Sequence, residues 1–497
     1  MVVFVIFQSA ICNLQFFGAL HLELAVDSHA HVSDGRLADD LPGVLSRAQA
    51  AGLEAVITVG AEHQPPACGG MRSSPPACGG LNEMLEMVQR EKLLYAAVGF
   101  HPHVAAQVKA VDWPALTDLA KQPKVVAVGE FGLDYHYEHS PRPAQRDVFA
   151  GGIRLALDLN LPLVIHSREA EADTLAALDA AGTMPRGVFH CFTGAPAYVR
   201  EALARGFYVS LSGIVTFPNS QNVRQAARAV PLERLLVETD SPYCAPVPLR
   251  GKVNEPANVV HVIRFLATLY GLSEDDVRRI TRRNAAHLFG LPLKSGGPCL
   301  VYPIRRRLYV NVTNACSNRC VFCPRSTGEL IVKGHDLRLA AEPTADEILA
   351  ALQQAGAPQY EEIVFCGFGE PTLRLEVVKE VARAVKGRWG RRTRLDTNGQ
   401  GSAIAGRDIT VELAGLIDTV SVSLDAPDAE TYERLCRPTI PNALAAVCDF
   451  LRQAKGRIPS VRATAVAVPG LDLEAIRRLA ERDLGVAFEV REFDVVG

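Results

Sequence analysis

The sequence LAVDSHAHV, residues 24–32, is the first of eight short β-rich runs that decide the fold of the N-terminal part of the chain. Helical patterns lie between these runs, and this alternation is typical of a parallel α/β fold. Eight repeats predict a closed (β/α)8 barrel, whose active site lies at the C-terminal ends of the strands. The predicted strands are 24–32, 55–60, 94–101, 125–132, 162–167, 187–192, 207–213 and 235–240.

Ligand-type side chains gather at the predicted strand ends. His29 and His31 are two positions apart, so both side chains leave one face of a strand and can bind one metal ion. Two hydrogen-bonded histidines at a polar strand end would explain this pair equally well. Four further candidates fall near the ends of the fourth, fifth, sixth and eighth strands: Glu130, His166, His190 and Asp240. All six groups are therefore expected on one rim, with donors that suit borderline divalent metals.

The sequences around these groups form an ordered set of motifs. They are DSHAH at 27–31, GFHPH at 99–103, GEFGLD at 129–134, IHSR at 165–168, HCFTG at 190–194, ETDSP at 238–242 and NEPAN at 254–258. Together they resemble the TatD family of metal-dependent deoxyribonucleases, which has a TIM-type barrel, over residues 24 to about 292. The resemblance implies that His29, His31 and Asp240 hold one ion, that His166 and His190 hold another, and that Glu130 bridges the two.

The chemistry of two divalent ions (Mg, Mn or Zn) fits a phosphodiesterase. Such ions activate a water and neutralise the charge of the phosphodiester, and Asp240 would orient or deprotonate that water. The formal net charge of −3 gives no basic surface for tight nucleic-acid binding, so DNA is expected as a transient substrate. Arg168, His101 and His103 are candidate substrate contacts, although solvated or hydrogen-bonded side chains explain them equally well. An ester or amide hydrolase, such as an aminoacyl-tRNA deacylase, is the alternative function.

Four segments are expected along the chain: an apolar extension at 1–23, the hydrolase at 24–292, a linker at 293–298 and a second domain at 299–497. No Lys or Arg precedes Arg36, so the positive region of a signal peptide is missing. We expect a cytoplasmic protein with no membrane association, and a membrane anchor is the alternative reading of the extension. The repeated PPACGG, at 65–70 and 75–80, predicts a loop, and we expect no function for Cys68 and Cys78.

The second domain carries three cysteines directly after its first predicted strand. Its predicted strands are 308–313, 362–365, 393–396, 419–424, 461–468 and 486–491, which indicate a partial (β/α)6 barrel. Cys316, Cys320 and Cys323 form C-x3-C-x2-C. Three thiolates leave one iron of a [4Fe–4S] cluster free to bind S-adenosylmethionine, whereas ordinary ferredoxin sites use four. A zinc site with His335 as its fourth ligand is the alternative.

Three further motifs resemble the radical S-adenosylmethionine (radical SAM) superfamily: GFGEPT at 367–372, TNG at 397–399 and SVSLDA at 421–426. The resemblance implies a partial radical SAM barrel in which a reduced cluster cleaves S-adenosylmethionine to a 5′-deoxyadenosyl radical. It also implies an electron donor such as flavodoxin or ferredoxin. The expected cofactor-binding residues are Gly367, Gly369, Glu370, Asn398, Ser423 and Asp425. Phe368 departs from the expected glycine pair, and Asp425 could equally cap the following helix.

The remaining cysteines of this domain, Cys366, Cys436 and Cys448, are not grouped like ligands of a second cluster, and we expect them to be small buried side chains. The whole chain is then a TatD-linked radical SAM fusion with two activities and an unassigned radical substrate. The rival hypothesis is that one half is a non-catalytic scaffold for the other. Both sets of candidate ligands are complete in the sequence, and this favours two enzymes.

Overall fold

The computed structural model describes residues 23–60, 79–293, 298–328 and 330–491. The chain forms two compact units, whose main boundary in the sequence lies between Leu291 and Pro292. Residues 1–22 of the expected extension, Cys68 and Cys78 of the repeated loop, and residues 294–297 of the expected linker lie outside the described residues. Among the described helices, none has the length and apolar character needed to cross a membrane.

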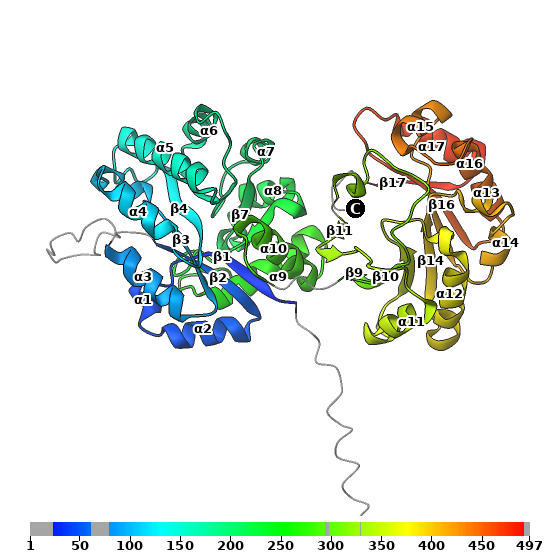
Figure 1. The fold of residues 1–497 in the computed structure, drawn as a ribbon, viewed down its shortest axis with the longest axis horizontal. Coiled ribbons are helices and arrows are strands. Elements are labelled where there is room, and N and C mark those ends of the chain that lie inside the picture. The colour runs from blue at the N-terminus through cyan, green and yellow to red at the C-terminus, as the bar shows by residue number, and fades with distance from the viewer. Residues whose placement is uncertain (1–22, 61–78, 294–297, 329, 492–497) are drawn as a thin grey trace, which may run out of the picture. The chain divides into compact units, whose positions relative to one another are not determined.

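The first unit contains eight parallel strands that lie side by side in sequence order, with helices on the outside (Figure 1). The strands are β1 (Ala25–Ala30), β2 (Leu53–Gly60), β3 (Leu94–Val98), β4 (Val125–Asp134), β5 (Leu163–Arg168), β6 (Gly187–Phe189), β7 (Tyr208–Leu211) and β8 (Leu235–Val237). Backbone hydrogen bonds from Asp240 N to His29 O (2.9 Å) and from His31 N to Ser241 O (2.7 Å) join the last strand to the first. The predicted (β/α)8 barrel is thereby confirmed.

Helices connect and cover these strands. The main ones are α2 (Leu41–Ala50), α3 (Gly79–Arg90), α4 (Asp112–Ala120), α5 (Arg142–Leu159), α6 (Glu171–Ala180), α7 (Pro196–Ala204), α8 (Gln221–Ala229), α9 (Val259–Tyr270) and α10 (Glu274–Phe289). Glycines let α5 pack closely, because a Cβ on Gly151 would overlap the ring of Trp113 in α4 and a Cβ on Gly152 would overlap the ring of Phe131 in β4. Residues on both faces of strands such as β2 are buried, as the nearly continuous apolar sequence of these strands predicts.

Several strands end earlier than predicted, and two of the candidate ligands follow such strands. β8 ends at Val237, three residues before Asp240, and β6 ends at Phe189, directly before His190. Asp240 has a left-handed backbone with φ of 53°, which extended strands do not adopt. Its amide donates to His29 O instead of continuing the pairing of β8 with β7. His190 and Asp240 thus belong to turns at the rim, whereas other candidate ligands, such as His29 and Glu130, lie within strands.

The second unit contains a seven-stranded sheet with the order β17-β16-β15-β14-β13-β10-β9. The strands are β9 (Val301–Ile304), β10 (Arg307–Asn311), β13 (Glu362–Cys366), β14 (Arg392–Thr397), β15 (Thr419–Ser423), β16 (Ser460–Val466) and β17 (Ala487–Arg491). All except β9 are parallel, and these six match the six predicted strands. β9 pairs antiparallel with β10 at one edge and was not predicted. A separate ribbon is formed by β11 (Ile331–Val332) and β12 (His335–Asp336).

Helices pack on one face of this sheet (Figure 1), and the helix-covered face is apolar. They are α11 (Ala345–Gln354), α12 (Leu375–Trp389), α13 (Gly401–Ala405), α14 (Thr410–Leu413), α15 (Ala429–Cys436), α16 (Ala443–Ala454) and α17 (Leu473–Arg478). In β14, Leu395 lies in this core, whereas Arg394 and Asp396 alternate to the other face. The inner face is therefore polar, as a site for polar ligands requires.

Candidate functional site

The first group of candidate ligands lies where β1 meets the turn after β8. His29 is the fifth residue of β1, and His31 directly follows the strand. Their Nε2 atoms are 3.3 Å apart, and the Oδ1 atom of Asp240 lies 3.9 Å from His29 Nε2 and 3.5 Å from His31 Nε2. Val59 O lies 3.0 Å from His31 Nδ1 and fixes its ring. The structure thus brings these three predicted ligands together.

The second group surrounds the carboxylate of Glu130, which lies in β4. Glu130 Oε1 is 2.7 Å from His166 Nδ1 and 2.5 Å from His190 Nε2, and these two nitrogens are 3.3 Å apart. The other oxygen, Oε2, is 3.4 Å from His29 Nε2. One carboxylate therefore faces both groups, in the position that a bridging ligand needs.

The spacing of these donors fits metal binding. Two nitrogens bound tetrahedrally at about 2.0–2.1 Å from one zinc ion are about 3.3 Å apart. That is the separation found between His29 and His31 and between His166 and His190. Each histidine pair also lies within 3.4 Å of an oxygen of Glu130. The residues present therefore fit two cations, one at each pair, with Glu130 between them.

Burial and charge set the protonation of this centre. Burial lowers the pKa of His29, and the nearby His190 lowers it further, so His29 is the neutral imidazole that binds metals. Burial raises the pKa of Glu130, but His190 and His101 overcome this effect and hold it well below its ordinary value. Burial also raises the pKa of Asp240, yet its hydrogen bond to His31 and the charges of the histidines bring it below the ordinary value. Both acids are carboxylates at neutral pH.

Asp134, at the end of β4, orients two histidines and was not among the predicted site residues. Its Oδ2 atom lies 3.1 Å from His166 Nε2 and 3.0 Å from His103 Nε2. Its Oδ1 atom accepts from the amides of His136 and Tyr137, so the carboxylate is fixed. Asp134 lies in the GEFGLD sequence that also contains Glu130. Its role depends on contacts with β5 and with the turn after β3, and only the fold shows these contacts.

The three weaker candidates lie at the same rim. His101 Nε2 is 3.5 Å from Glu130 Oε1, and His101 Nδ1 accepts a hydrogen bond from the amide of His103. Arg168, the last residue of β5, is exposed, and its guanidinium stacks on the ring of Tyr137 at 4.7 Å. His101 and His103 therefore join the network of Glu130 and Asp134, while Arg168 stays at the outer edge.

In the second unit, the three cysteines lie in the loop after β10, and all are half-buried. Backbone hydrogen bonds tie this loop to the end of α15, from Arg319 N to Cys436 O (2.9 Å) and from Val321 N to Leu435 O (2.8 Å). Two N–H groups point at Cys316 Sγ, those of Asn318 N at 3.4 Å and Asn398 Nδ2 at 3.9 Å. Donors to sulfur stabilise thiolates bound to iron, so the loop fits a cluster.

His335, the fourth ligand of the zinc alternative, has other neighbours. Its Nδ1 atom is 3.7 Å from Cys299 Sγ, and its Nε2 atom is 3.2 Å from Pro303 O. Cys436 and Cys448 lie in the apolar core, as expected, whereas Cys366 is only half-buried. Cys366 ends β13, and burial together with the nearby charge of Asp396 raises the pKa of its thiol to about 12. The expectation of a buried apolar environment is therefore wrong for Cys366.

The GFGEPT turn is fixed by Glu370. Its carboxylate is buried and accepts hydrogen bonds from the amide and hydroxyl of Thr372, from Thr397 Oγ1 and from Asn398 N. The turn after β13 is thereby joined to the TNG sequence after β14. Asn398 Nδ2 donates to Ser317 Oγ at 2.8 Å, which connects the same sequence to the cysteine loop. Glu370 and Asn398 thus hold three loops together at one edge of the sheet.

Gly369 must be a glycine, because a Cβ atom there would overlap the carbonyl oxygens of Thr313 and Ala315. Gly367 has a φ of 145°, a conformation open to glycine alone. Ser423 ends β15, and Asp425 follows it with a buried side chain that accepts from Val466 N at 3.1 Å. The helix after it is capped by Asp428 and not by Asp425. The alternative that Asp425 is a helix cap is therefore wrong.

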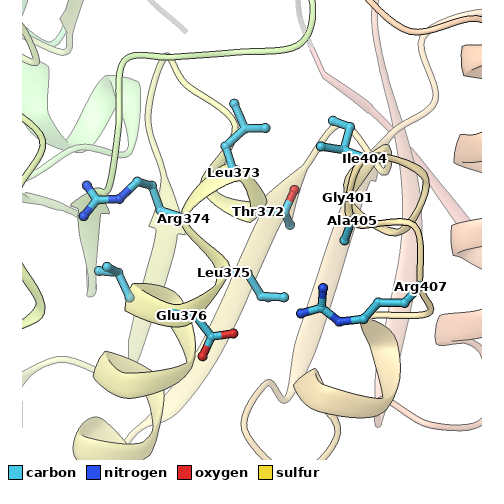
Figure 2. Close-up of a pocket in the computed structure, with 10 residues that line it drawn as sticks. Thr372, Leu373, Arg374, Leu375, Glu376, Gly401, Ile404, Ala405 and Arg407 are labelled. Atoms are coloured by element: carbon cyan, nitrogen blue, oxygen red, sulfur yellow. The ribbon is translucent and has the colours of Figure 1, made fainter.

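A hollow of about 400 Å³ lies beside the GFGEPT turn (Figure 2). It is lined by the segment that leads from the GFGEPT turn into α12 and by α13, including Leu373, Ile404 and Ala405. Its charged side chains have partners: Arg374 pairs with Glu342 at 2.7 Å and Arg407 with Glu412 at 2.9 Å. The lining contains none of the three cysteines, so this hollow is separate from the candidate cluster site.

Comparison with protein families identifies both units. Residues 26–290 match the model of the TatD related DNase family, and residues 310–482 match that of the radical SAM superfamily. An uncharacterised metal-dependent hydrolase of Bacillus subtilis, YabD, is 36% identical over 264 residues, which are 53% of this chain and 98% of the relative. A protein of Citrobacter rodentium named 3′-5′ ssDNA/RNA exonuclease TatD is 31% identical over 275 residues, 54% of this chain and 99% of the relative.

Among solved structures, YjjV, a TatD homologue from Escherichia coli K12, has a TM-score of 0.49 and 25% identity. That comparison covers 55% of this chain and 99% of the other. The match to the TatD related DNase family extends over the first unit, and the radical SAM match extends over the second.

Proposed function

Because the chain belongs to the TatD related DNase family and carries a radical SAM domain in its second unit, we propose that it is a bifunctional enzyme. Its first unit is a metal-dependent hydrolase, and we assign it phosphodiester hydrolysis of DNA by a two-metal site. Its second unit is a radical SAM domain, and we assign it reductive cleavage of S-adenosylmethionine at a [4Fe–4S] cluster. The substrate of the radical reaction is not assigned.

The position of Glu130 carries the hydrolase proposal. Both of its oxygens face histidines, His29 on one side and His166 and His190 on the other. His29, His31 and Asp240 would hold one divalent ion, His166 and His190 the second, and Glu130 both. When bound, the ions would supply the Lewis acidity that activates water and neutralises the phosphodiester.

The protein's own residues prepare this reaction. Asp240 is ionised and lies at the rim with 13% of its side chain exposed, so it can hold an incoming water by hydrogen bonding and take its proton. Asp134 fixes the ring of His166 through Nε2, which leaves Nδ1 for the metal side. Arg168, His101 and His103 lie at the same rim as the candidate ligands and are proposed contacts of the DNA backbone.

The radical half rests on the cysteine loop and the two sequences connected to it. Cys316, Cys320 and Cys323 would bind three irons, and the bound cluster would supply the electron that cleaves S-adenosylmethionine. The carboxylate of Glu370 already accepts hydrogen bonds within the protein, which hold the GFGEPT turn in place. The backbone carbonyls of Gly367 and Gly369 are therefore the groups proposed to accept a hydrogen bond from the cofactor amine. Asn398, Ser423 and Asp425 lie after or at the ends of β14 and β15 and are proposed cofactor contacts.

One experiment tests both halves. Anaerobically purified protein is reduced with dithionite and incubated with S-adenosylmethionine, single-stranded DNA and Mn²⁺, and 5′-deoxyadenosine and nucleotides are measured together. We expect both products, and we expect chelation by EDTA to abolish nucleotide release. Release of an amino acid from aminoacyl-tRNA, without nucleotides from DNA, would replace the phosphodiesterase assignment by the deacylase one. In the cell, flavodoxin or ferredoxin is the proposed electron donor, and DNA is a transient partner.

A further inference from the structure

Two thiols lie beside the proposed metal centre and have no role in it. Cys191 directly follows His190, and Cys244 lies four residues after Asp240. Their Sγ atoms are 3.9 Å apart, and Cys244 Sγ is 3.3 Å from Asp240 Oδ2. The two sulfurs and an oxygen of Asp240 all lie within 4.8 Å of one another. A pair of thiols and a carboxylate thus converge on one point.

We propose that Cys191, Cys244 and Asp240 form a third cation site, specific for a thiophilic divalent ion such as Zn²⁺. Two sulfurs bound tetrahedrally at about 2.3 Å from zinc are about 3.8 Å apart, and a sulfur and a carboxylate oxygen are about 3.6 Å apart. The separations in the structure, 3.9 and 3.3 Å, are close to these values. Thiolates select zinc over magnesium and manganese, so this site differs in preference from the neighbouring centre.

Asp240 connects the new site to the two-metal centre, and in this respect the inference rests on the proposed function. Its Oδ1 atom faces His29 and His31, whereas its Oδ2 atom faces Cys244. A carboxylate with one oxygen toward each group can bind one ion on each side. Zinc at the thiols would then withdraw electron density from the carboxylate that is proposed to take a proton from water.

The surroundings of Cys191 hold its sulfur in place. The amide of Cys191 donates to Glu238 Oε1 at 2.6 Å, and Ser212 Oγ lies 3.1 Å from the sulfur, where its hydroxyl can donate to a thiolate. Three protein donors leave one tetrahedral position for a water or a phosphate oxygen, which is the arrangement of zinc sites that take part in reactions. The site is therefore suited to an exchangeable ligand.

The test uses the full chain, purified anaerobically with its iron–sulfur cluster in place and then equilibrated with Zn²⁺. Zinc per chain is measured by mass spectrometry, and the zinc K-edge X-ray absorption spectrum is recorded, which detects sulfur bound to zinc independently of iron. We expect the native chain to show a sulfur shell at about 2.3 Å. The Cys191→Ser/Cys244→Ser variant should bind one zinc fewer and lose that shell, whereas Cys448→Ser, in the core of the second unit, should do neither.

Absence of zinc–sulfur scattering from the native chain would overturn the proposal, as would unchanged zinc content in the double variant. So would recovery of Cys191 and Cys244 as a disulfide from anaerobically prepared, zinc-loaded protein. Glu130→Gln separates this inference from the proposed function, because it removes the bridging ligand but no donor of the thiol site. Nuclease activity that survives Glu130→Gln would refute the two-metal mechanism, while zinc–sulfur scattering in the same variant would still support the third site.

Discussion

Single carboxylates organise both candidate sites, and each acts through hydrogen bonds from more than one loop. Asp134 holds His166 and His103, which come from β5 and from the turn after β3. Glu370 holds the ends of β13 and β14 together in the second unit. A buried carboxylate with several donors is costly to replace, since each donor would lose its partner.

Asp134→Asn tests whether this carboxylate orients His166 for metal binding. The amide has nearly the same shape but no charge, so it holds the histidine N–H groups more weakly. We expect Mn²⁺ affinity, measured by calorimetric titration, to fall about 10- to 100-fold, the range typical for residues that orient metal ligands. Asp173→Asn is the matched control, because Asp173 accepts from Tyr135 and Arg146 at the surface. Equal affinities in the two variants would refute the role of Asp134.

We expect Asp425 to make the stability of the second unit depend on pH. Burial raises the pKa of its carboxyl from 3.8 to about 6, against the lowering effects of Arg491 and of the Val466 amide. Between these values the folded protein binds a proton that the unfolded chain has lost, so the free energy of unfolding falls as pH rises. The loss is complete above about pH 7 and is on the order of 3 kcal/mol.

Asp425→Asn removes this titration while keeping an oxygen that can accept from Val466 N. We expect the variant to melt higher than the native chain at pH 8 and to gain less as the pH is lowered from 7 to 5, as measured by scanning calorimetry. Asp428→Asn, at the exposed N-terminus of α15, changes no buried charge and should retain the native slope over this range. A native slope in Asp425→Asn would show that its carboxyl does not titrate as proposed.

At the scale of elements, strand periodicity predicted the fold because buried parallel strands are nearly continuous apolar runs separated by helical patterns. Periodicity did not predict where the strands end, because the ends depend on backbone turns such as the one at Asp240. The amide of Asp240 donates to the carbonyl of His29, which lies near the other end of the barrel sequence. The edge strand β9 was missed because its four residues, VYPI, contain a proline and resemble a linker. Asp134 was missed because its two histidine partners come from different elements, β5 and the turn after β3.

Gly369→Ala tests the packing of the GFGEPT turn against the cysteine loop. Its Cβ would meet the backbone oxygens of Thr313 and Ala315, and neither can move without displacing the chain that leads to Cys316. We expect iron and acid-labile sulfide per chain to fall severalfold after reconstitution. Gly387→Ala, in α12, meets no atom within 4 Å and should stabilise the helix by up to about 1 kcal/mol with full iron content. Full iron content in both variants would contradict the proposed contact.

At the scale of the whole molecule, each unit has its own sheet, its own core and its own candidate site. The ligands of the metal centre come from elements between β1 and the turn after β8, and those of the cluster come from the loop after β10. No residue proposed for one site belongs to the unit that holds the other. The two proposed reactions would therefore use separate residues within one chain, and a variant in one site is expected to spare the other.

Two single variants of the full chain test this separation. Glu130→Gln should lower nucleotide release from single-stranded DNA at least a hundredfold, because a neutral amide is a poor bridge between two cations, while leaving 5′-deoxyadenosine formation unchanged. Cys316→Ala should abolish 5′-deoxyadenosine formation, because the cluster loses one of three thiolates, while leaving nucleotide release unchanged. Each variant is thus the folding control for the other. If either variant abolished both products, the two sites would depend on each other. That result would contradict the separation inferred from their separate cores and separate ligands.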